Sequence, residues 1–486
     1  MADAFPLTVR LDADAQRLAG GRALIGGSPA RLFRLGPRGA QVVEAIERGE
    51  SLDPDARPLV ERLLDAGAVH PDASTGPPGS LARLTVVVPA YGPLVNDAVA
   101  AFAGTAATIV VDDASPVPLA VADATVIRHQ HNRGPAAARN TALAHVATEL
   151  VAYIDTDCLP AVAWIRQLLP HFADPRVALV APRIVSPAAP GAGALARYEA
   201  ARSPLDLGNR PARVAPASRV AYVPGAAFVA RTCVLRDVGG FTEALRVGED
   251  VDLVWRLHAA GWRVRYDPSA SVIHTPRAEL GAFLRQRFAY GTSAGPLAVR
   301  HGDAVTPLRA APLSIGGWLL AAAGHPLLGT ALPLAAAVPL TPRIGRSVEG
   351  AAAALRLTSR GHFATGYQLA RSITRPWWPI AAVASLVSRR ARCAVGIAAA
   401  VPALLELARE RPELDPLRYT ALRLLDDAAY GAGVWRGARA ARQWAPLLPA
   451  VTGWPTLGSW ATGGSSRSPS RSGRPSGGSR SPSTAR

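Results

Sequence analysis

The chain has 486 residues, 49% of them hydrophobic, which is enough for two or three folded domains with large cores. The formal net charge is +17, and because the sequence contains no lysine, the basic side chains are arginines apart from ten histidines. The three cysteines are scattered without a C-x-x-C pair, which excludes a disulfide framework and a structural zinc site. The first residues have neither a basic start nor a long apolar run, so we expect no signal peptide.

Residues 1–70 have the strand and helix pattern of a small α+β domain. The predicted segments are strands at 7–11 and 31–35, helices at 41–49 and 57–67, and a wing strand at 68–70. This order resembles the winged-helix peptide-recognition domains that accompany ribosomally made, modified peptides. A winged helix that binds DNA, or one that only packs on the next domain, is the alternative interpretation.

Residues 71–80 are rich in proline and glycine and form a predicted linker, after which residues 81–305 follow a repeating strand and helix rhythm. The first predicted strands are 84–89, 108–111, 126–127 and 151–154, with helices at 95–103 and 134–147. Short apolar strands separated by helices predict an α/β fold with a parallel sheet covered on both faces. In such sheets ligands bind beyond the carboxyl ends of the strands.

Two carboxylates follow the strand at 151–154, and this D-x-D sequence is a candidate metal clamp. Asp155 and Asp157 can converge on one hard divalent cation, which in turn holds a diphosphate. The alternative is that one of them caps the helix that starts near Pro160. His274, at the end of a later strand, is either a third metal ligand or a buried structural histidine.

A second polar cluster favours a nucleotide. Asp112 and Asp113 end another buried strand, where a carboxylate can accept hydrogen bonds from a base or a ribose, although a turn residue and a helix cap are the alternative. The loop that contains Asn132 and Gly134 precedes a helix with Arg139 in its first turns, and both helix N-termini and arginines suit phosphate.

The sequence after the first strand argues against other nucleotide-binding proteins. Residues 89–92, which include Pro89 and Tyr91, occupy the place of a G-x-G-x-x-G motif, so a dinucleotide-binding dehydrogenase is disfavoured. The chain has no G-x-x-x-x-G-K-S/T sequence, which excludes a P-loop.

A third cluster is the candidate acceptor and catalytic side. Gly225 and Ala226 follow a proline within an apolar segment, where backbone can approach a ligand closely. Glu249 and Asp250 open a predicted helix that carries Trp255, and stabilisation of the helix N-terminus is the alternative role of both acids. A carboxylate at this position can also act as a general base.

Residues 88–91, 111–115, 132–140 and 155–157 together resemble, in order and spacing, the family 2 glycosyltransferases of the GT-A fold. The resemblance implies that Asp112 or Asp113 touches uracil, Arg139 the nucleotide, Asp157 the metal, and that Asp250 is the general base of an inverting enzyme. We therefore assign donor binding to Pro89, Tyr91, Asp112, Asp113, Asn132, Gly134, Arg139 and Asp155, metal binding to Asp157, Asp155 and His274, acceptor contacts to Gly225, Ala226 and Trp255, and catalysis to Asp250 and Glu249.

Residues 203–208 and 290–297 are similar to segments of the mycofactocin-system glycosyltransferases, a family that also carries a peptide-recognition-like N-terminal domain. This resemblance implies a UDP-sugar donor, Mg²⁺ or Mn²⁺, and transfer of glucose to a peptide-derived redox cofactor, with β-1,4 chain extension. A cell-envelope glycosyltransferase with a lipid or polysaccharide acceptor is the alternative. We expect no nucleic-acid partner.

The last third of the chain changes character. Residues 306–452 contain long apolar runs interrupted by prolines, glycines and arginine clusters, which predict helices that either lie on the catalytic domain or attach to a membrane surface. We favour a cytoplasmic protein with peripheral or monotopic attachment at the cytoplasmic face. Residues 453–486 are mostly Ser, Arg, Gly and Pro and are predicted to be disordered.

Overall fold

The computed structural model describes residues 8–18, 20–76, 79–92, 99–159, 161–276, 279–345 and 347–452. One compact unit spans residues 1–452. The tail predicted to be disordered, 453–486, lies outside the described residues, as does half of the helix predicted at 95–103.

The small N-terminal part contains the predicted strands and helices. Its elements are β1 (Val9–Leu11), β2 (Gln16–Leu18), β3 (Ala23–Gly26), β4 (Arg31–Arg34), α1 (Pro37–Arg48), α2 (Arg57–Ala66) and β5 (Val69–Pro71). Gly67 ends α2 in the left-handed region at φ 73°, where glycine has no steric penalty, and the chain returns as β5 antiparallel to β1. The sequence reasoning missed β2 and β3, which form an antiparallel three-stranded sheet with β4.

The central sheet has eight strands and buries apolar side chains on both faces. In spatial order they are β11 (Ala212–Arg213), β13 (Arg263–Ile273), β10 (Val177–Val185), β12 (Ala227–Arg231), β9 (Leu150–Ile154), β6 (Leu84–Ala90), β7 (Ala107–Asp112) and β8 (Thr125–Arg128). Successive side chains of β6 alternate between two cores, with Val87 in one and Val86 and Val88 in the other.

The prediction of a purely parallel sheet was wrong. Strands β6, β7, β8 and β9 are parallel, but β12 runs antiparallel to both β9 and β10, and β11 runs antiparallel to β13. In the apolar segment that contains Gly225 and Ala226, only residues from Ala227 join the sheet. The irregular backbone before Ala227 leaves the N–H of Gly225 available to a side chain of the site.

Helices flank the sheet and continue into the C-terminal region. Residues 81–305, the predicted glycosyltransferase domain, are called the catalytic part. Its helices are α4 (Pro135–His145), α5 (Val162–Leu168), α6 (Ala194–Arg202), α7 (Thr232–Asp237), α8 (Glu249–Ala259), α9 (Leu280–Thr292) and α10 (Ala294–His301). The C-terminal elements are β14 (Arg309–Ala310), α11 (Pro312–Ala322), α12 (Pro326–Leu334), α13 (Ala337–Ile344), α14 (Val348–Thr374), α15 (Trp378–Val387), α16 (Arg389–Glu410), α17 (Pro416–Ala441) and β15 (Ala450–Val451).

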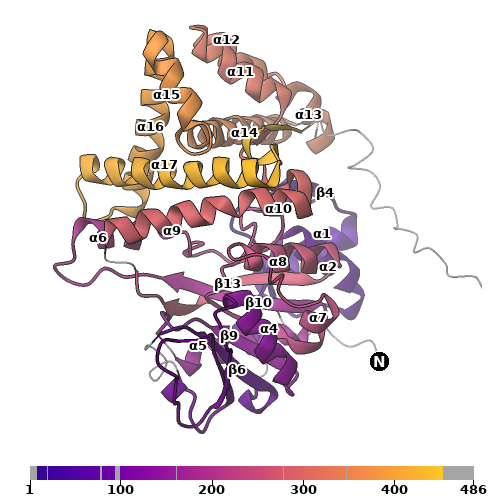
Figure 1. Cartoon of the computed structure of the whole chain (residues 1–486). Coiled ribbons are helices and arrows are strands. Elements are labelled where there is room, and N and C mark those ends of the chain that lie inside the picture. The colour runs from indigo at the N-terminus through magenta and orange to yellow at the C-terminus, as the bar shows by residue number, and fades with distance from the viewer. Residues whose placement is uncertain are drawn as a thin grey trace, which may run out of the picture. The chain divides into compact units, whose positions relative to one another are not determined.

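Helix α17 lies alongside α9 and α10, with α14, α15 and α16 beyond it (Figure 1). Glycines make this approach possible, since a Cβ on Gly433 would lie 2.0 Å from the carbonyl oxygen of Phe288 and one on Gly437 would lie 2.2 Å from that of Thr292. A side chain at either position would force the helices apart. The C-terminal helices are therefore joined to the catalytic part through direct backbone contact.

Buried charges add to this contact. Arg202 of α6 pairs with Asp426 and Asp427 of α17, and Arg287 of α9 pairs with Glu199 and Asp426. The Arg287 side chain is 2% exposed within this network. Buried pairs of this kind are satisfied only when both helices are in place.

Candidate active site

Asp113 organises the loop that leads into α4. Its two carboxylate oxygens accept hydrogen bonds from the backbone N–H groups of Arg133 (2.8 Å) and Gly134 (2.7 Å) and from the His129 ring (2.7 Å). The amide of Asn132 donates to the carbonyl oxygen of Asp113. Asp113 is 4% exposed, so its carboxylate shapes the 131–134 loop.

Asp112 is equally buried and has a similar role in its own turn. It accepts the backbone N–H groups of Ser115 and Leu119 and pairs with Arg128. Burial alone would raise the pKa of Asp112, but these hydrogen bonds outweigh it and lower the pKa. Of the two residues assigned to donor binding near the end of β6, Pro89 is partly buried and Tyr91 is 61% exposed.

Arg139 connects the D-x-D sequence to the Glu249–Asp250 pair. Its guanidinium is 2% exposed and donates to Asp155 (2.8 Å), to Glu249 (2.7 Å) and to the carbonyl oxygen of Gly225 (3.1 Å). Burial disfavours the charge, but the neighbouring Asp155 and Glu249 carboxylates outweigh it and raise the pKa of Arg139. Three segments that are far apart in sequence thus meet at one cation.

The two carboxylates of the D-x-D sequence have different partners. The Asp155 carboxylate is turned to Arg139, and burial raises its pKa although Arg139 opposes the rise. The Asp157 side chain is 43% exposed and lies 3.3 Å from Nε2 of His274, whose Nδ1 lies 3.3 Å from the Ser186 hydroxyl. The contact with Ser186 orients the imidazole toward Asp157, and sequence reasoning gave no sign of Ser186.

The residues around Asp157 fit a divalent cation that takes further ligands from its substrate. Within the described ranges no three His, Cys, Asp or Glu side chains converge as a complete metal site. Mg²⁺ and Mn²⁺ ions that bind nucleotides use one or two carboxylates, and phosphate oxygens complete their coordination. The exposed carboxylate of Asp157 and the oriented imidazole of His274 match such a partial set, whereas Asp155 is already engaged by Arg139.

Asp250 lies at the start of α8, where backbone N–H groups fix it. One carboxylate oxygen accepts the N–H of Gly225 at 2.8 Å and the other that of Val251 at 2.7 Å. Burial raises the pKa of Asp250 although these two N–H groups and Arg139 oppose the rise. Burial, and then the charge of Asp250, also raise the pKa of Glu249 to about 7.

The three residues predicted to contact the acceptor have different surroundings. Gly225 lies between Arg139 and Asp250, and a Cβ there would come within 3.1 Å of the Arg139 guanidinium. Ala226 is buried and supports the D-x-D turn, because its carbonyl oxygen accepts the N–H of Asp155. Trp255 is a core residue that is 6% exposed and donates its indole N–H to the carbonyl oxygen of Ala221.

Tyr222 is a neighbour of Asp250 that the sequence reasoning did not single out. Burial raises the pKa of its phenol, and the charge of Asp250 adds to the effect, followed by that of Tyr430. Arg375 opposes the rise, and its guanidinium lies 3.9 Å from the ring centroid of Tyr430. Tyr430 of α17 and Arg375, which follows α14, therefore contribute to the electrostatic environment of Tyr222, which no local motif indicates.

Residues 83–292 match the family described as glycosyltransferase like family 2. The chain is also 42% identical over 463 residues to the pre-mycofactocin glycosyltransferase of Mycobacterium tuberculosis, in strains CDC 1551 and H37Rv alike, and the match covers 91% of this chain and 97% of that protein. The chain belongs to the family 2 glycosyltransferases. Within that family it is of the mycofactocin-system type, as its sequence segments indicated.

Two further similarities are narrower. A stretch of 75 residues, 15% of this glycosyltransferase and 24% of the relative, is 40% identical to N-acetylglucosaminyl-diphospho-decaprenol L-rhamnosyltransferase of M. tuberculosis. A mannosyltransferase from Pyrobaculum calidifontis, solved in complex with GDP-Man and Mn²⁺, superposes with a TM-score of 0.38 at 18% identity over 78% of this chain and 95% of that one. A TM-score this low supports no statement about mechanism.

Proposed function

We propose that this glycosyltransferase is a metal-dependent inverting enzyme of the mycofactocin pathway. It transfers a hexose, glucose from UDP-glucose, to a peptide-derived redox cofactor and extends the product as a β-1,4-glucan. The observation that carries the proposal is the buried guanidinium of Arg139, which joins Asp155 of the D-x-D to Glu249 beside Asp250. Donor-side and acceptor-side carboxylates thus belong to one hydrogen-bonded network.

The proposed reaction places one residue set on each side of the sugar. Tyr91 stacks on the base, the loop held by Asp113 faces the nucleotide, and Asp157 with His274 would hold a divalent cation. That cation, when bound, neutralises the charge of the departing diphosphate. Asp250 takes the proton of the acceptor hydroxyl as the new C–O bond forms on the face opposite the leaving group.

The hydrogen bonds of Asp250 suit a base. The N–H groups of Gly225 and Val251 fix both carboxylate oxygens, so the acceptor meets an oriented group. Its raised pKa increases its proton affinity over that of a solvated aspartate. Arg139 acts as a positioning residue, since it holds Glu249 beside Asp250 without reaching the acceptor.

A lipid or polysaccharide acceptor is the second candidate, and exposed apolar side chains favour it. Two segments, Pro326–Ile344 and Arg389–Glu410, are long and apolar enough to cross a membrane, and only 17% of each is buried within the described chain. Leu327 is 86% exposed. Helices α11, α12 and α15 extend beyond α14 and α17 at the end of the molecule away from the sheet (Figure 1). These helices support our proposal of peripheral or monotopic attachment at the cytoplasmic face of the membrane.

The two acceptor classes can be separated with purified full-length protein, radiolabelled UDP-glucose and Mn²⁺. One reaction receives the small-molecule fraction of a mycofactocin-producing cell, and the other receives its lipid extract. We expect label in a water-soluble product whose mass increases by whole hexose increments. Label only in the lipid phase would select the second candidate, and no transfer in either reaction would refute a UDP-glucose-dependent enzyme. An Asp250→Asn variant is the control for label incorporated without catalysis.

A further inference from the structure

A buried arginine without hydrogen-bond partners lies at the boundary between the N-terminal part and the catalytic sheet. Arg265 of β13 is 2% exposed. Among the residues that the structure describes, none of its three side-chain nitrogens has a hydrogen-bond partner. A buried guanidinium is normally paired, because removing its five N–H donors from water without new acceptors is costly. The arginine therefore needs a ligand that the described chain does not provide.

The register of the sheet places a second arginine directly beside it. Arg213 of β11 is the cross-strand partner of Arg265 in the antiparallel pair of β11 and β13. Like charges directly opposite each other on one face of a sheet repel. Burial lowers the pKa of Arg265 to about 10, and the neighbouring Arg263 contributes to the fall. This electrostatic surrounding suits an anion between the strands.

The acids nearby already have partners. Asp65 of α2 binds Arg263 at 2.7 Å and Arg176 at 3.1 Å, and Asp174 binds Arg263 at 2.7 Å. Asp12 is engaged by His70, Arg210 and Arg219. Among the described residues, neither the Arg265 nor the Arg213 guanidinium thus donates a hydrogen bond to a carboxylate.

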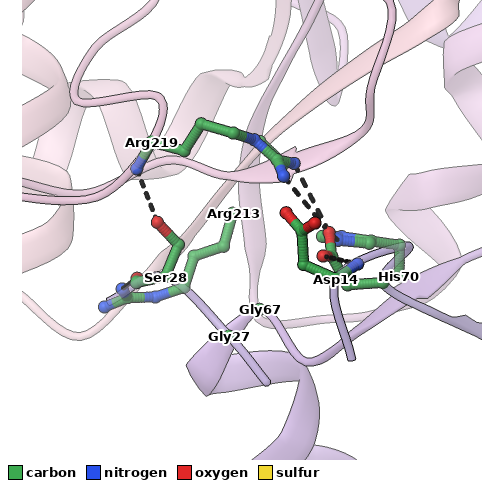
Figure 2. Close-up of a pocket in the computed structure, with 9 residues that line it drawn as sticks. Asp14, Gly27, Ser28, Gly67, His70, Arg213 and Arg219 are labelled. Carbon is green, nitrogen blue, oxygen red and sulfur yellow. Dashed lines mark hydrogen bonds and ion pairs between the residues drawn. The ribbon is translucent and has the colours of Figure 1, made fainter. Parts of the chain in front are cut away.

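Two cavities adjoin these arginines. One, of about 150 Å³, is lined by Arg265, Arg213, Arg263, Arg176 and His258. Leu64 and Asp65 of the N-terminal part complete its lining. A smaller one of about 90 Å³ shares Arg213 and lies between the Asp12–Asp14 turn, His70 and Arg219. Figure 2 shows the smaller cavity, with Arg213 and Arg219 contributed by the catalytic part and Ser28 and His70 by the N-terminal part. The larger volume is roughly ten times what one water molecule requires.

We propose that Arg265 and Arg213 form an oxyanion site between the N-terminal part and the catalytic sheet, which takes a phosphate or carboxylate group. Both groups present paired oxygens to a guanidinium fork, which is the geometry that arginine recognises. The site is separate from the donor site, since Arg265 pairs with Val180 of β10 whereas Ile273, next to His274, pairs with Val185, roughly 17 Å further along β10. A bound anion would join the two parts by neutralising the repulsion between the cross-strand arginines.

The test uses full-length protein with UDP and Mn²⁺ kept saturating, so that the donor site is occupied. Thermal unfolding is followed as phosphate, sulfate or acetate replaces chloride at constant ionic strength. We expect the melting temperature to rise with phosphate, acetate or both and to reach a plateau. The stronger of these two responses identifies the group as a phosphate or a carboxylate.

Variants separate this site from other anion effects. Arg265→Gln should weaken the apparent affinity for the anion about tenfold or more, because a charged donor is lost. Arg38→Gln is the matched control, since it removes one arginine charge from an exposed pair with Asp55 in the N-terminal part. If Arg265→Gln does not fold, Arg213→Gln takes its place, and an unchanged response of that variant would refute the site.

The remaining outcomes are equally decisive. A linear response without a plateau would mean that water alone solvates Arg265, and a plateau retained by Arg265→Gln would place the anion elsewhere; either result overturns the proposal. Neither outcome depends on glycosyl transfer, so failure of the oxyanion site and failure of the proposed enzymatic function are distinguishable.

Discussion

The pKa of Glu249 makes the stability of this glycosyltransferase depend on pH in a way that one substitution should remove. Burial and the neighbouring Asp250 raise the pKa of Glu249 from the ordinary 4.5 to about 7. A carboxyl group with a higher pKa in the folded than in the unfolded state binds its proton more tightly when folded. Its contribution to stability is fully present below pH 4.5 and is lost as the pH rises through about 7.

The magnitude follows from the same pKa values. A rise from 4.5 to about 7 corresponds to roughly 3 kcal/mol of differential free energy, as an order of magnitude for a group so close to a second carboxyl. Glu249→Gln keeps an acceptor for Arg139 but cannot ionise. Between about pH 5 and about pH 8, the unfolding free energy of the wild type should therefore fall relative to that of the variant by up to about 3 kcal/mol.

The assay is guanidinium unfolding of both proteins across that pH range in one buffer mixture. Glu243→Gln is the matched control, because Glu243 lies on the neighbouring loop, binds Arg133 and Asn140, and is 43% exposed. Its pH dependence should parallel that of the wild type. Parallel curves for wild type and Glu249→Gln, or a variant that loses stability relative to wild type as the pH rises, would contradict the assignment of a raised pKa to Glu249.

Four further outcomes are expected. Asp250→Asn should leave UDP-sugar binding unchanged in calorimetry and reduce transfer by about 10²- to 10⁴-fold, so an active variant would refute the base. Asp157→Ala should weaken Mn²⁺-dependent UDP affinity by at least about tenfold, and undiminished affinity with Mn²⁺ would argue against this ligand. Gly437→Ala should lower the unfolding free energy by about 1–3 kcal/mol because its Cβ meets the Thr292 carbonyl oxygen, whereas Gly316→Ala, whose Cβ would make an ordinary contact with Leu332 at 3.5 Å, should be neutral or stabilising. Leu327→Asp should reduce flotation with anionic vesicles if α12 contacts the membrane, and equal flotation would exclude that helix.

The catalytic sheet was predictable because its signals are local. Continuous apolar runs such as 84–89 and 151–154 can only be buried strands, and the polar residues that follow them lie at one edge of a parallel sheet. The positions of Asp113 and Asp155 follow from this rule. The antiparallel insertion of β12 does not, because its apolar residues suit either strand direction equally well.

Residues whose partners lie far away in sequence were not predictable. Arg139 was expected at the nucleotide, yet its partners are 16 and 110 residues away and on other elements. Arg287 is a second example. An arginine can bind a phosphate or face solvent, and the sequence does not show that this one pairs with Asp426 of α17. Trp255 was expected at the acceptor because it follows Asp250 on the same helix, but it lies on the face of α8 that packs into the core.

The contacts of the N-terminal part bear on how the peptide-recognition role predicted for it can be tested. Its sheet packs Leu18, Ala23 and Ile25 against Ile344 of α13 and residues of α14, and its Asp65 pairs with Arg263 of the catalytic sheet. Removal of residues 1–75 would therefore expose apolar surface and take one of two carboxylate partners from the buried Arg263, which would keep only Asp174. A truncated protein that fails to use its acceptor would not distinguish lost recognition from lost folding. Point substitutions at exposed positions just after α1, such as Glu50→Arg, leave both contacts intact and can separate lost recognition from lost folding.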